Sequence, residues 1–266
     1  MSKPIITSAQ NPRIKHVVML QQKAQQRRAE DRIVVEGVRE ILHCSKAGHT
    51  IETVFCCPQL SGYSELALSN VGELIDVSPE VYSKIAYRST TEGLIAIVKP
   101  KHSTLNDLRL EENPLIIVIE GVEKPGNIGA ILRSADAAQA TAVVVCDPLT
   151  DLFNPNIIRS SIGAIFTVPC VACSTDECIT FLKQNNIKIL TAQLQDSQLY
   201  YHACMTGPTA IVMGTESTGL SNAWREAADE HILIPMKGEL DSLNVSVSAA
   251  ILLFEAVRQR ESLNSH

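Results

Sequence analysis

Residues 232–258, which read ILIPMKGELDSLNVSVSAAILLFEAVR, decide the fold expected for this chain. The stretch opens with an apolar run at 232–236 that a proline interrupts, which predicts a strand ending near Pro235. A polar loop follows at 237–244. From about 245 to 260 the pattern predicts a helix.

The predicted helix is apolar on nearly all sides. Between 245 and 257 only Ser246, Ser248 and Glu255 are polar, and they define no single solvent-facing stripe. A helix of this kind is normally buried all round. One side can pack on a sheet of the same chain, and a partner subunit is the simplest cover for the other. A central core helix in a monomer is the alternative.

The start of this helix is unusually polar. Ser242, Asn244 and Ser246 lie where the free backbone N–H groups of a helix gather. Capping needs only one of them, so the loop is a candidate binding site.

Composition indicates one large or two ordinary globular domains. The chain has 266 residues, of which 45% are hydrophobic. We find no signal peptide and no apolar run long enough to span a bilayer, so a cytoplasmic protein is expected. Its eight cysteines are then expected to be reduced. Cys170 and Cys173 form one CxxC without a second pair at zinc-finger spacing, so buried free cysteines and no metal are expected.

The net charge of −6 is unevenly distributed. Residues 1–35 carry +5 and the remainder carries −11. Such asymmetry is typical of a nucleic-acid-binding arm, although a solvated helix face gives the same pattern. The basic residues of this arm that we expect to contact nucleic acid are Arg13, Lys15, Arg27 and Arg28.

The first hundred residues are expected to form a small α/β domain. The expected strands are 32–35, 51–57, 73–77 and 94–98. The expected helices are 12–28, 38–46, one near 63–68 and one that starts at Pro79. Residues 99–114 lose apolar periodicity and hold two of the prolines, which predicts a linker.

The second half alternates apolar β-branched runs with helices, which indicates a parallel sheet covered on both faces. Ligands of such sheets lie outside the carboxyl ends of the strands. The polar loops at 121–127, 214–221 and 237–244 all fall there. The expected strands are 115–120, 142–146, 165–168, 188–194, 209–214 and 232–236.

The three loops match no nucleotide fingerprint. Neither GxGxxG after the first strand of this half nor GxxxxGK[ST] is present, and the histidines lie outside the loops. Spacing alone therefore predicts a ligand site on a parallel sheet, with ordinary turns as the alternative.

The loops carry a resemblance to the SpoU (TrmH-like) family of RNA ribose 2′-O-methyltransferases. The matching motifs stand in family order: Asn127-x-Gly129 with Arg133, then Met213-Gly214-x-Glu216-x-x-Gly219-Leu220-Ser221, then Ile234-Pro235-Met236-x-Gly238 with Ser242-Leu243-Asn244-Val245-Ser246. The N-terminal part, with Thr7-Ser8-x-x-Asn11-Pro12 and Val34-Val35-Glu36-Gly37, resembles the substrate-binding domain of the ribosomal-RNA members.

This resemblance implies an RNA-binding domain at 1–105, similar to ribosomal protein L30e, a linker at 106–113 and a catalytic domain at 114–266. The catalytic domain would be an α/β fold with a deep trefoil knot, of the SPOUT type. Threading of this kind is nearly absent among folds, so patterns alone do not predict it. The resemblance also implies a homodimer through the C-terminal helix.

The resemblance further implies S-adenosylmethionine as cofactor, held by Gly214, Ile234, Met236, Ser242 and Leu243. Its catalytic set, carried over by position, is Asn127, Arg133, Glu216, Ser242 and Asn244. The family often assigns the arginine as base. A guanidinium is effectively always charged, so our hypothesis is that Arg133 grips an RNA phosphate and stabilises the developing alkoxide. Ser217 departs from the family, which commonly has glycine there.

Other functions stay open beside methylation of ribosomal RNA of the large subunit. They are methylation of transfer RNA, antibiotic resistance by self-methylation of ribosomal RNA, and RNA binding without catalysis. A separate basic N-terminal domain favours ribosomal RNA, because it supplies a surface that reads the shape of a folded RNA element.

Overall fold

The computed structural model describes residues 5–61, 71–87, 92–214 and 219–264. The chain divides into two compact units. Unit 1 comprises Met1–Lys101 and Phe153–Thr167, and unit 2 comprises His102–Leu152 and Val168–His266. Among the described residues, no helix combines the length and the apolarity needed to cross a membrane.

Unit 1 is built on a four-stranded mixed sheet with the order β1-β4-β2-β3. Strand β4 runs antiparallel to both β1 and β2, whereas β2 and β3 are parallel. Its strands are β1 (Ile33–Glu36), β2 (Thr50–Cys56), β3 (Glu73–Asp76) and β4 (Leu94–Lys99). All four strands expected from the sequence are therefore confirmed, with ends that differ by one residue.

The helices of unit 1 differ from expectation at one place. The single helix expected at 12–28 is interrupted at Lys23, whose backbone is extended, with φ −115° and ψ 107°. The expected helix near 63–68 lies outside the described residues. The helices in this part are α1 (Pro12–Gln22), α2 (Ala24–Glu30), α3 (Val38–Lys46) and α4 (Pro79–Ile85).

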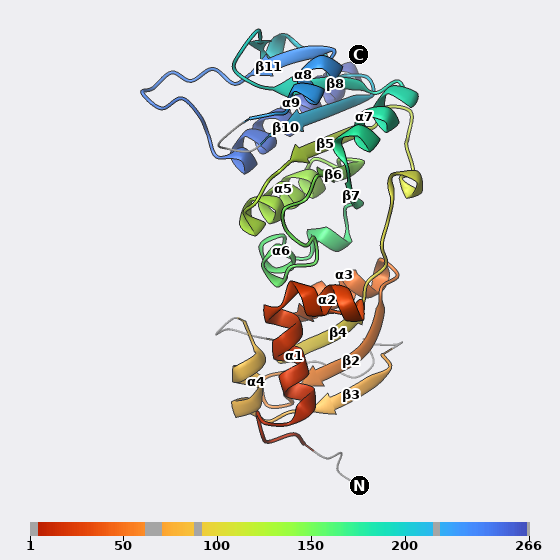
Figure 1. The fold of residues 1–266 in the computed structure, drawn as a ribbon, viewed down its shortest axis with the longest axis vertical. Coiled ribbons are helices and arrows are strands. Elements are labelled where there is room, and N and C mark those ends of the chain that lie inside the picture. The colour runs from red at the N-terminus through yellow and green to blue at the C-terminus, as the bar shows by residue number, and fades with distance from the viewer. Residues whose placement is uncertain (1–4, 62–70, 88–91, 215–218, 265–266) are drawn as a thin grey trace. The chain divides into compact units, whose positions relative to one another are not determined.

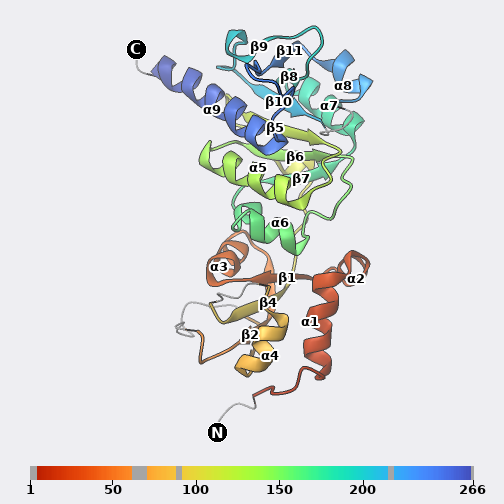
Figure 2. The same ribbon diagram turned by 90° about the vertical axis from the view of Figure 1, so that its left-hand side faces the viewer.

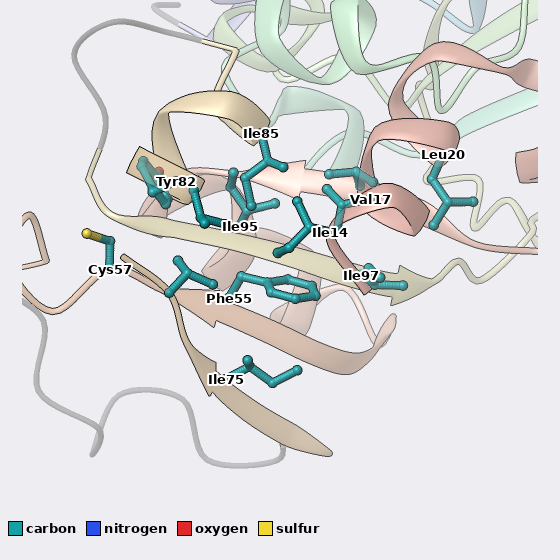
Figure 3. Close-up of a cluster of buried hydrophobic side chains, with 13 residues drawn as sticks. Ile14, Val17, Leu20, Phe55, Cys57, Ile75, Tyr82, Ile85, Ile95 and Ile97 are labelled. Atoms are coloured by element: carbon teal, nitrogen blue, oxygen red, sulfur yellow. The ribbon is translucent and has the colours of Figure 1, made fainter. Parts of the chain in front are cut away.

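One core holds helices α1 and α4 on the sheet. Ile14 and Val17 of α1 point toward Phe55 of β2 and Ile95 of β4 (Figure 3). Each of these four side chains is at most 1% exposed. Ile14 and Val17 lie three residues apart and therefore share one face of α1, which places the other faces of the helix toward solvent.

Unit 2 contains a seven-stranded sheet in which every pair of neighbouring strands is parallel, as the sequence predicts. The order is β7-β6-β5-β10-β8-β11-β9. Its strands are β5 (Leu115–Glu120), β6 (Ala142–Cys146), β7 (Cys170–Cys173), β8 (Lys188–Ala192), β9 (Gln198–Leu199), β10 (Thr209–Met213) and β11 (Glu230–Leu233).

Strand β10 is inserted between two strands that precede it in the sequence. Met213 at its end lies beside Ile119 of β5 and Ala192 of β8. Ala192 in turn lies beside Ile232 of β11. The carboxyl ends of four strands are therefore nearly level, and the loops that follow them start at one edge of the sheet.

Helices cover both faces of this sheet (Figures 1 and 2). Helices α5 and α9 pack side by side on one face, and α7 and α8 cover the opposite face, where Trp224 is fully buried. These helices are α5 (Pro125–Ala137), α7 (Thr175–Gln184), α8 (Asn222–Ala227) and α9 (Val245–Asn264). Two short segments of unit 2 form 3-10 turns, η2 (Leu105–Asp107) and η4 (Tyr200–His202).

The strand expected at 165–168 is wrong. Ala164–Phe166 form a 3-10 turn, η3, which follows Gly163 at a φ of +84°, and the strand of this region is β7. The turn is apolar because it is buried, and a short apolar run does not distinguish a strand from another buried segment. Together with α6 (Pro155–Ser160), it packs with α3 and β1 in unit 1.

Arg260 fixes the C-terminal part of α9. Its guanidinium donates to the carbonyl oxygens of Asn113 at 2.8 Å, Met205 at 3.0 Å and Gly207 at 2.8 Å. Burial lowers the pKa of Arg260, and the carbonyl oxygens offset the loss of hydration. The helix is thereby tied to the segments that lead into β5 and β10.

Arg27 is not on the basic surface that the sequence predicts. Its side chain is 4% exposed, and its guanidinium donates to the carbonyl oxygens of Leu20 at 2.7 Å and Gln21 at 3.2 Å. These carbonyls lie at the end of α1, where helical hydrogen bonds run out. The expected contact of Arg27 with nucleic acid is therefore wrong, because the side chain is buried and its guanidinium binds the end of α1.

The neighbouring arginines give a matched test of this assignment. We predict that Arg27→Ala lowers the free energy of unfolding by about 2 kcal/mol, since buried carbonyls lose charged donors. Arg28→Ala, at an exposed position, should change it by less than about 0.5 kcal/mol. Urea unfolding followed by circular dichroism measures both. Equal effects would contradict the structural role of Arg27.

Candidate active site

A carboxylate lies at the carboxyl edge of the unit 2 sheet. Glu120, the last residue of β5, accepts the backbone N–H of Ser221 at 2.8 Å. The Thr175 hydroxyl lies 3.0 Å from Glu120 and 2.7 Å from Asp147, so it can donate to either carboxylate. Sequence reasoning did not select Glu120. Its position at the carboxyl end of the first strand of this half was the available signal.

The two ends of the loop after β10 lie close together. A Cβ atom built on Gly214 would lie 2.5 Å from the carbonyl carbon of Gly219 and 2.6 Å from the nitrogen of Leu220. Gly219 has a φ of +69°, which glycine adopts without strain. Two glycines therefore close this loop, one by its lack of volume and one by its backbone conformation. Glu216 and Ser217, which lie between them, are outside the described residues.

Two asparagines 117 positions apart in the sequence meet at the start of α9. Oδ1 of Asn244 accepts the backbone N–H of Ser246 at 2.9 Å and its hydroxyl at 2.6 Å. Nδ2 of Asn244 donates to Oδ1 of Asn127 at 3.2 Å. Asn244 thus uses one end of its amide to cap α9 and the other to bind α5. The structure brings these two predicted site residues together.

Arg133 is an exposed residue on α5. It lies six residues after Asn127, which corresponds to about 240° around a helix, so the two side chains leave α5 in different directions. Arg133 has no hydrogen-bond or ion-pair partner within the described residues. Its guanidinium is therefore available to an anion.

The loop from β11 to α9 offers backbone groups to a ligand. Ile234 and Met236 follow β11 and are partly buried, whereas Ser242 and Leu243 are exposed. No backbone group of residues 236–243 makes a backbone hydrogen bond in the part of the chain that the structure describes. The Ser242 hydroxyl donates to Asp241 at 3.2 Å. Such a segment can bind a ligand through its own N–H and C=O groups.

The basic residues of unit 1 remain at its surface, with the exception of Arg27. Lys15 and Arg28 are exposed, and Arg13 is about half exposed while it forms an ion pair with Glu73 at 2.7 Å. An exposed pair of this kind contributes little to stability, so Arg13 can exchange Glu73 for a phosphate at small cost.

The two glycines of the loop after β10 support a test by stability. We predict that Gly214→Ala lowers the free energy of unfolding by about 2–4 kcal/mol, because the added methyl group meets backbone atoms that cannot turn away. Gly219→Ala meets no atom within 4 Å and should lose only about 1–2 kcal/mol through its positive φ. Chemical denaturation of both variants checks the order, and a larger loss for Gly219→Ala would refute the close contact.

Known proteins resemble both parts of this chain. The model of the SpoU rRNA Methylase family matches residues 114–254, and the MRM3-like substrate binding domain matches residues 11–96. The 23S rRNA (guanosine-2'-O-)-methyltransferase RlmB of Photobacterium profundum is 39% identical over 187 residues, which cover 64% of this chain and 72% of that protein.

Solved structures match nearly the whole chain. The crystal structure of an RNA 2'-O ribose methyltransferase is 40% identical with a TM-score of 0.85, and the match covers 97% of this chain and 100% of that one. The AdoMet-bound rRNA methyltransferase from Sinorhizobium meliloti is 28% identical with a TM-score of 0.87, covering 96% and 97%. Together with the family match over more than half of the sequence, these likenesses show that the chain belongs to the SpoU rRNA methylase family.

Proposed function

We propose that this protein transfers a methyl group from S-adenosylmethionine to a ribose 2′-hydroxyl of large-subunit ribosomal RNA. Family membership and the ribosomal RNA substrate in the name of the RlmB relative support this function. The contact of Asn127 with Asn244 carries the proposal structurally, because it joins the first and third family motifs at one edge of the sheet. A ribosomal RNA substrate would also place the protein in the cytoplasm.

The cofactor site proposed here consists of Gly214, Ile234, Met236, Ser242 and Leu243. The unpaired backbone groups of 236–243 fit a ligand held by main-chain atoms. S-adenosylmethionine supplies a methyl group on a sulfonium, whose positive charge disappears on transfer. Backbone and apolar contacts suit that change, because a carboxylate against the sulfonium would stabilise the reactant more than the transition state.

Arg133 is proposed to bind the phosphate beside the target ribose and to stabilise the oxygen that loses its proton. Its exposure and lack of a partner in the described chain support this role. A guanidinium does not give up its proton near neutral pH, so Arg133 acts by charge and hydrogen bonding. Asn127, Ser242 and Asn244 would orient the ribose. Glu216 belongs to the proposed set by its place in the second motif.

A trefoil knot is proposed for unit 2. Strand β10 enters the sheet between β5 and β8, and the chain then returns so that α9 packs on α5. The insertion of β10 and the return of the chain to α5 support a knot, in which the chain passes through a loop formed by its earlier part. The mixed sheet of unit 1 with helices on it is likewise proposed to be an L30e-like domain that binds RNA.

A homodimer through α9 is proposed from the exposed apolar residues of that helix. Val247 is 47% exposed, Phe254 is 49% exposed and Leu263 is 62% exposed. Val247 and Phe254 lie seven residues apart and share one face of the helix. A face of this kind, opposite the buried Ala249, Leu252 and Ala256, fits a second copy of the same helix.

Methyl transfer to RNA tests the function. We predict that the wild type labels one ribose of unmodified ribosomal RNA with the methyl group of labelled S-adenosylmethionine. Arg133→Ala should lower the rate at least 100-fold, and Arg133→Lys should recover only part of it, because lysine keeps the charge without the planar fork. Thermal unfolding of both variants should match the wild type, since the side chain is exposed.

The other functions predict different results in the same assay. Label on transfer RNA alone would contradict the ribosomal substrate. Binding of both cofactor and RNA without transfer to ribosomal RNA, either free or in assembly intermediates, would contradict the enzymatic function.

The dimer has a test of its own. We predict that Phe254→Asp converts the protein to a monomer, because a carboxylate would lose its hydration in an apolar interface. Light scattering after size exclusion measures the mass. Arg109→Asp, at an exposed position before β5, is the control for charge and should leave the mass unchanged. A wild-type mass of one chain would refute the dimer.

A further inference from the structure

Three cysteines converge at the carboxyl edge of the unit 2 sheet, on the side away from the proposed cofactor loops in strand order. They are Cys146, Cys173 and Cys178, and their Sγ atoms all lie within 4.8 Å of one another. None of the three belongs to a disulfide, and none belongs to a family motif. The methyl-transfer site described above uses none of these sulfur atoms.

The fold explains why the three sulfurs meet. Cys146 is the last residue of β6 and Cys173 the last residue of β7, and the two are paired in the parallel register. Paired residues of neighbouring strands point to the same face of a sheet. Helix α7 covers that face, and Cys178 lies in its first turns. Three separate elements therefore hold the sulfurs in place before any ligand binds.

The three sulfur atoms differ in their access to solvent. Cys146 and Cys178 are fully buried, and Cys173 is partly exposed, so the cluster opens to solvent on one side only. The adjacent carboxylates are engaged elsewhere: Asp147 accepts from Thr175, and Glu177 accepts from Ser174. The adjacent carboxylates thus have partners of their own, whereas the three sulfur atoms face one another.

We propose that Cys146, Cys173 and Cys178 bind one Zn²⁺ ion through their sulfur atoms, with a water molecule entering beside Cys173 as fourth ligand. Zinc–sulfur bonds of about 2.3 Å in a tetrahedron place sulfurs about 3.8 Å apart, so the cluster needs a contraction of no more than about 1 Å. On binding, the ion replaces the protons of the thiols, which pass to the solvent. The ion ties β6 and β7 to α7.

Spacing in the sequence gave no sign of this site. The sequence contains a CxxC at Cys170 and Cys173, but only Cys173 belongs to the cluster. Residues three apart on a strand point to opposite faces of the sheet, which directs Cys170 away from the other sulfurs. The expectation of no metal rested on linear zinc-finger spacing, whereas these ligands come together through strand pairing.

Cobalt binding to the full-length, reduced, metal-free protein tests the site. Titration with Co²⁺ should give a thiolate-to-cobalt charge-transfer band in the near ultraviolet and visible bands of a tetrahedral ion, at one equivalent. One equivalent of Zn²⁺ should abolish them. Saturating Zn²⁺ should also raise the Tm by about 5 °C, since the ion binds the folded form.

Two cysteine variants from the same strand separate this site from chance binding. Cys173→Ala should lose the bands while circular dichroism shows a folded protein, because its side chain is partly exposed. Cys170→Ala should keep them. The proposal is overturned if the wild type gives no thiolate band at micromolar Co²⁺, if Cys173→Ala retains the band, or if Cys170→Ala loses it. Methyl transfer is scored separately, so its failure leaves this test intact.

Discussion

The carboxylate of Glu120 is the constraint on which the edge of the parallel sheet depends. It ends β5, accepts the N–H of Ser221 at the start of α8, and lies within hydrogen-bonding distance of Thr175 at the start of α7. A single acceptor thereby joins two helix starts to one strand end. Because helix starts gather unpaired N–H groups and positive potential, a carboxylate is the side chain that suits this position.

The rest of the proposed site divides into a fixed and an open part. Asn127 and Asn244 fix α5 to the start of α9, and Gly214 lies in close contact with Gly219. Arg133 and the backbone of 236–243 have no partners within the described residues. A binding site is expected to combine such fixed contacts with unpaired groups, because a ligand can then be bound and its charge stabilised with little reorganisation of the protein.

Much of the fold could be predicted from the sequence, because strands of buried parallel sheets are continuous apolar runs. The strand prediction for 165–168 failed because a buried 3-10 turn is as apolar as a buried strand. The prediction that Arg27 contacts nucleic acid failed because its charge does not reveal whether the guanidinium binds carbonyl oxygens of the same chain. The family resemblance selected Asn127 and Asn244, but their hydrogen bond depends on the packing of α9 against α5, which no local pattern encodes. Glu120 and the three-cysteine cluster belong to no sequence motif. Their contacts join segments that are distant in the sequence and that the fold of the sheet brings together.

The segment Phe153–Thr167 has a consequence for how such a protein can be rearranged in evolution or by engineering. It lies between β6 and β7 of the parallel sheet in sequence, yet it contributes Ile157, Ile158 and Phe166 as buried side chains to unit 1. The chain therefore passes from one unit to the other three times. Unit 1 cannot be cut out between Lys101 and His102 and grafted elsewhere as a whole, because its last segment is encoded within the sequence of unit 2.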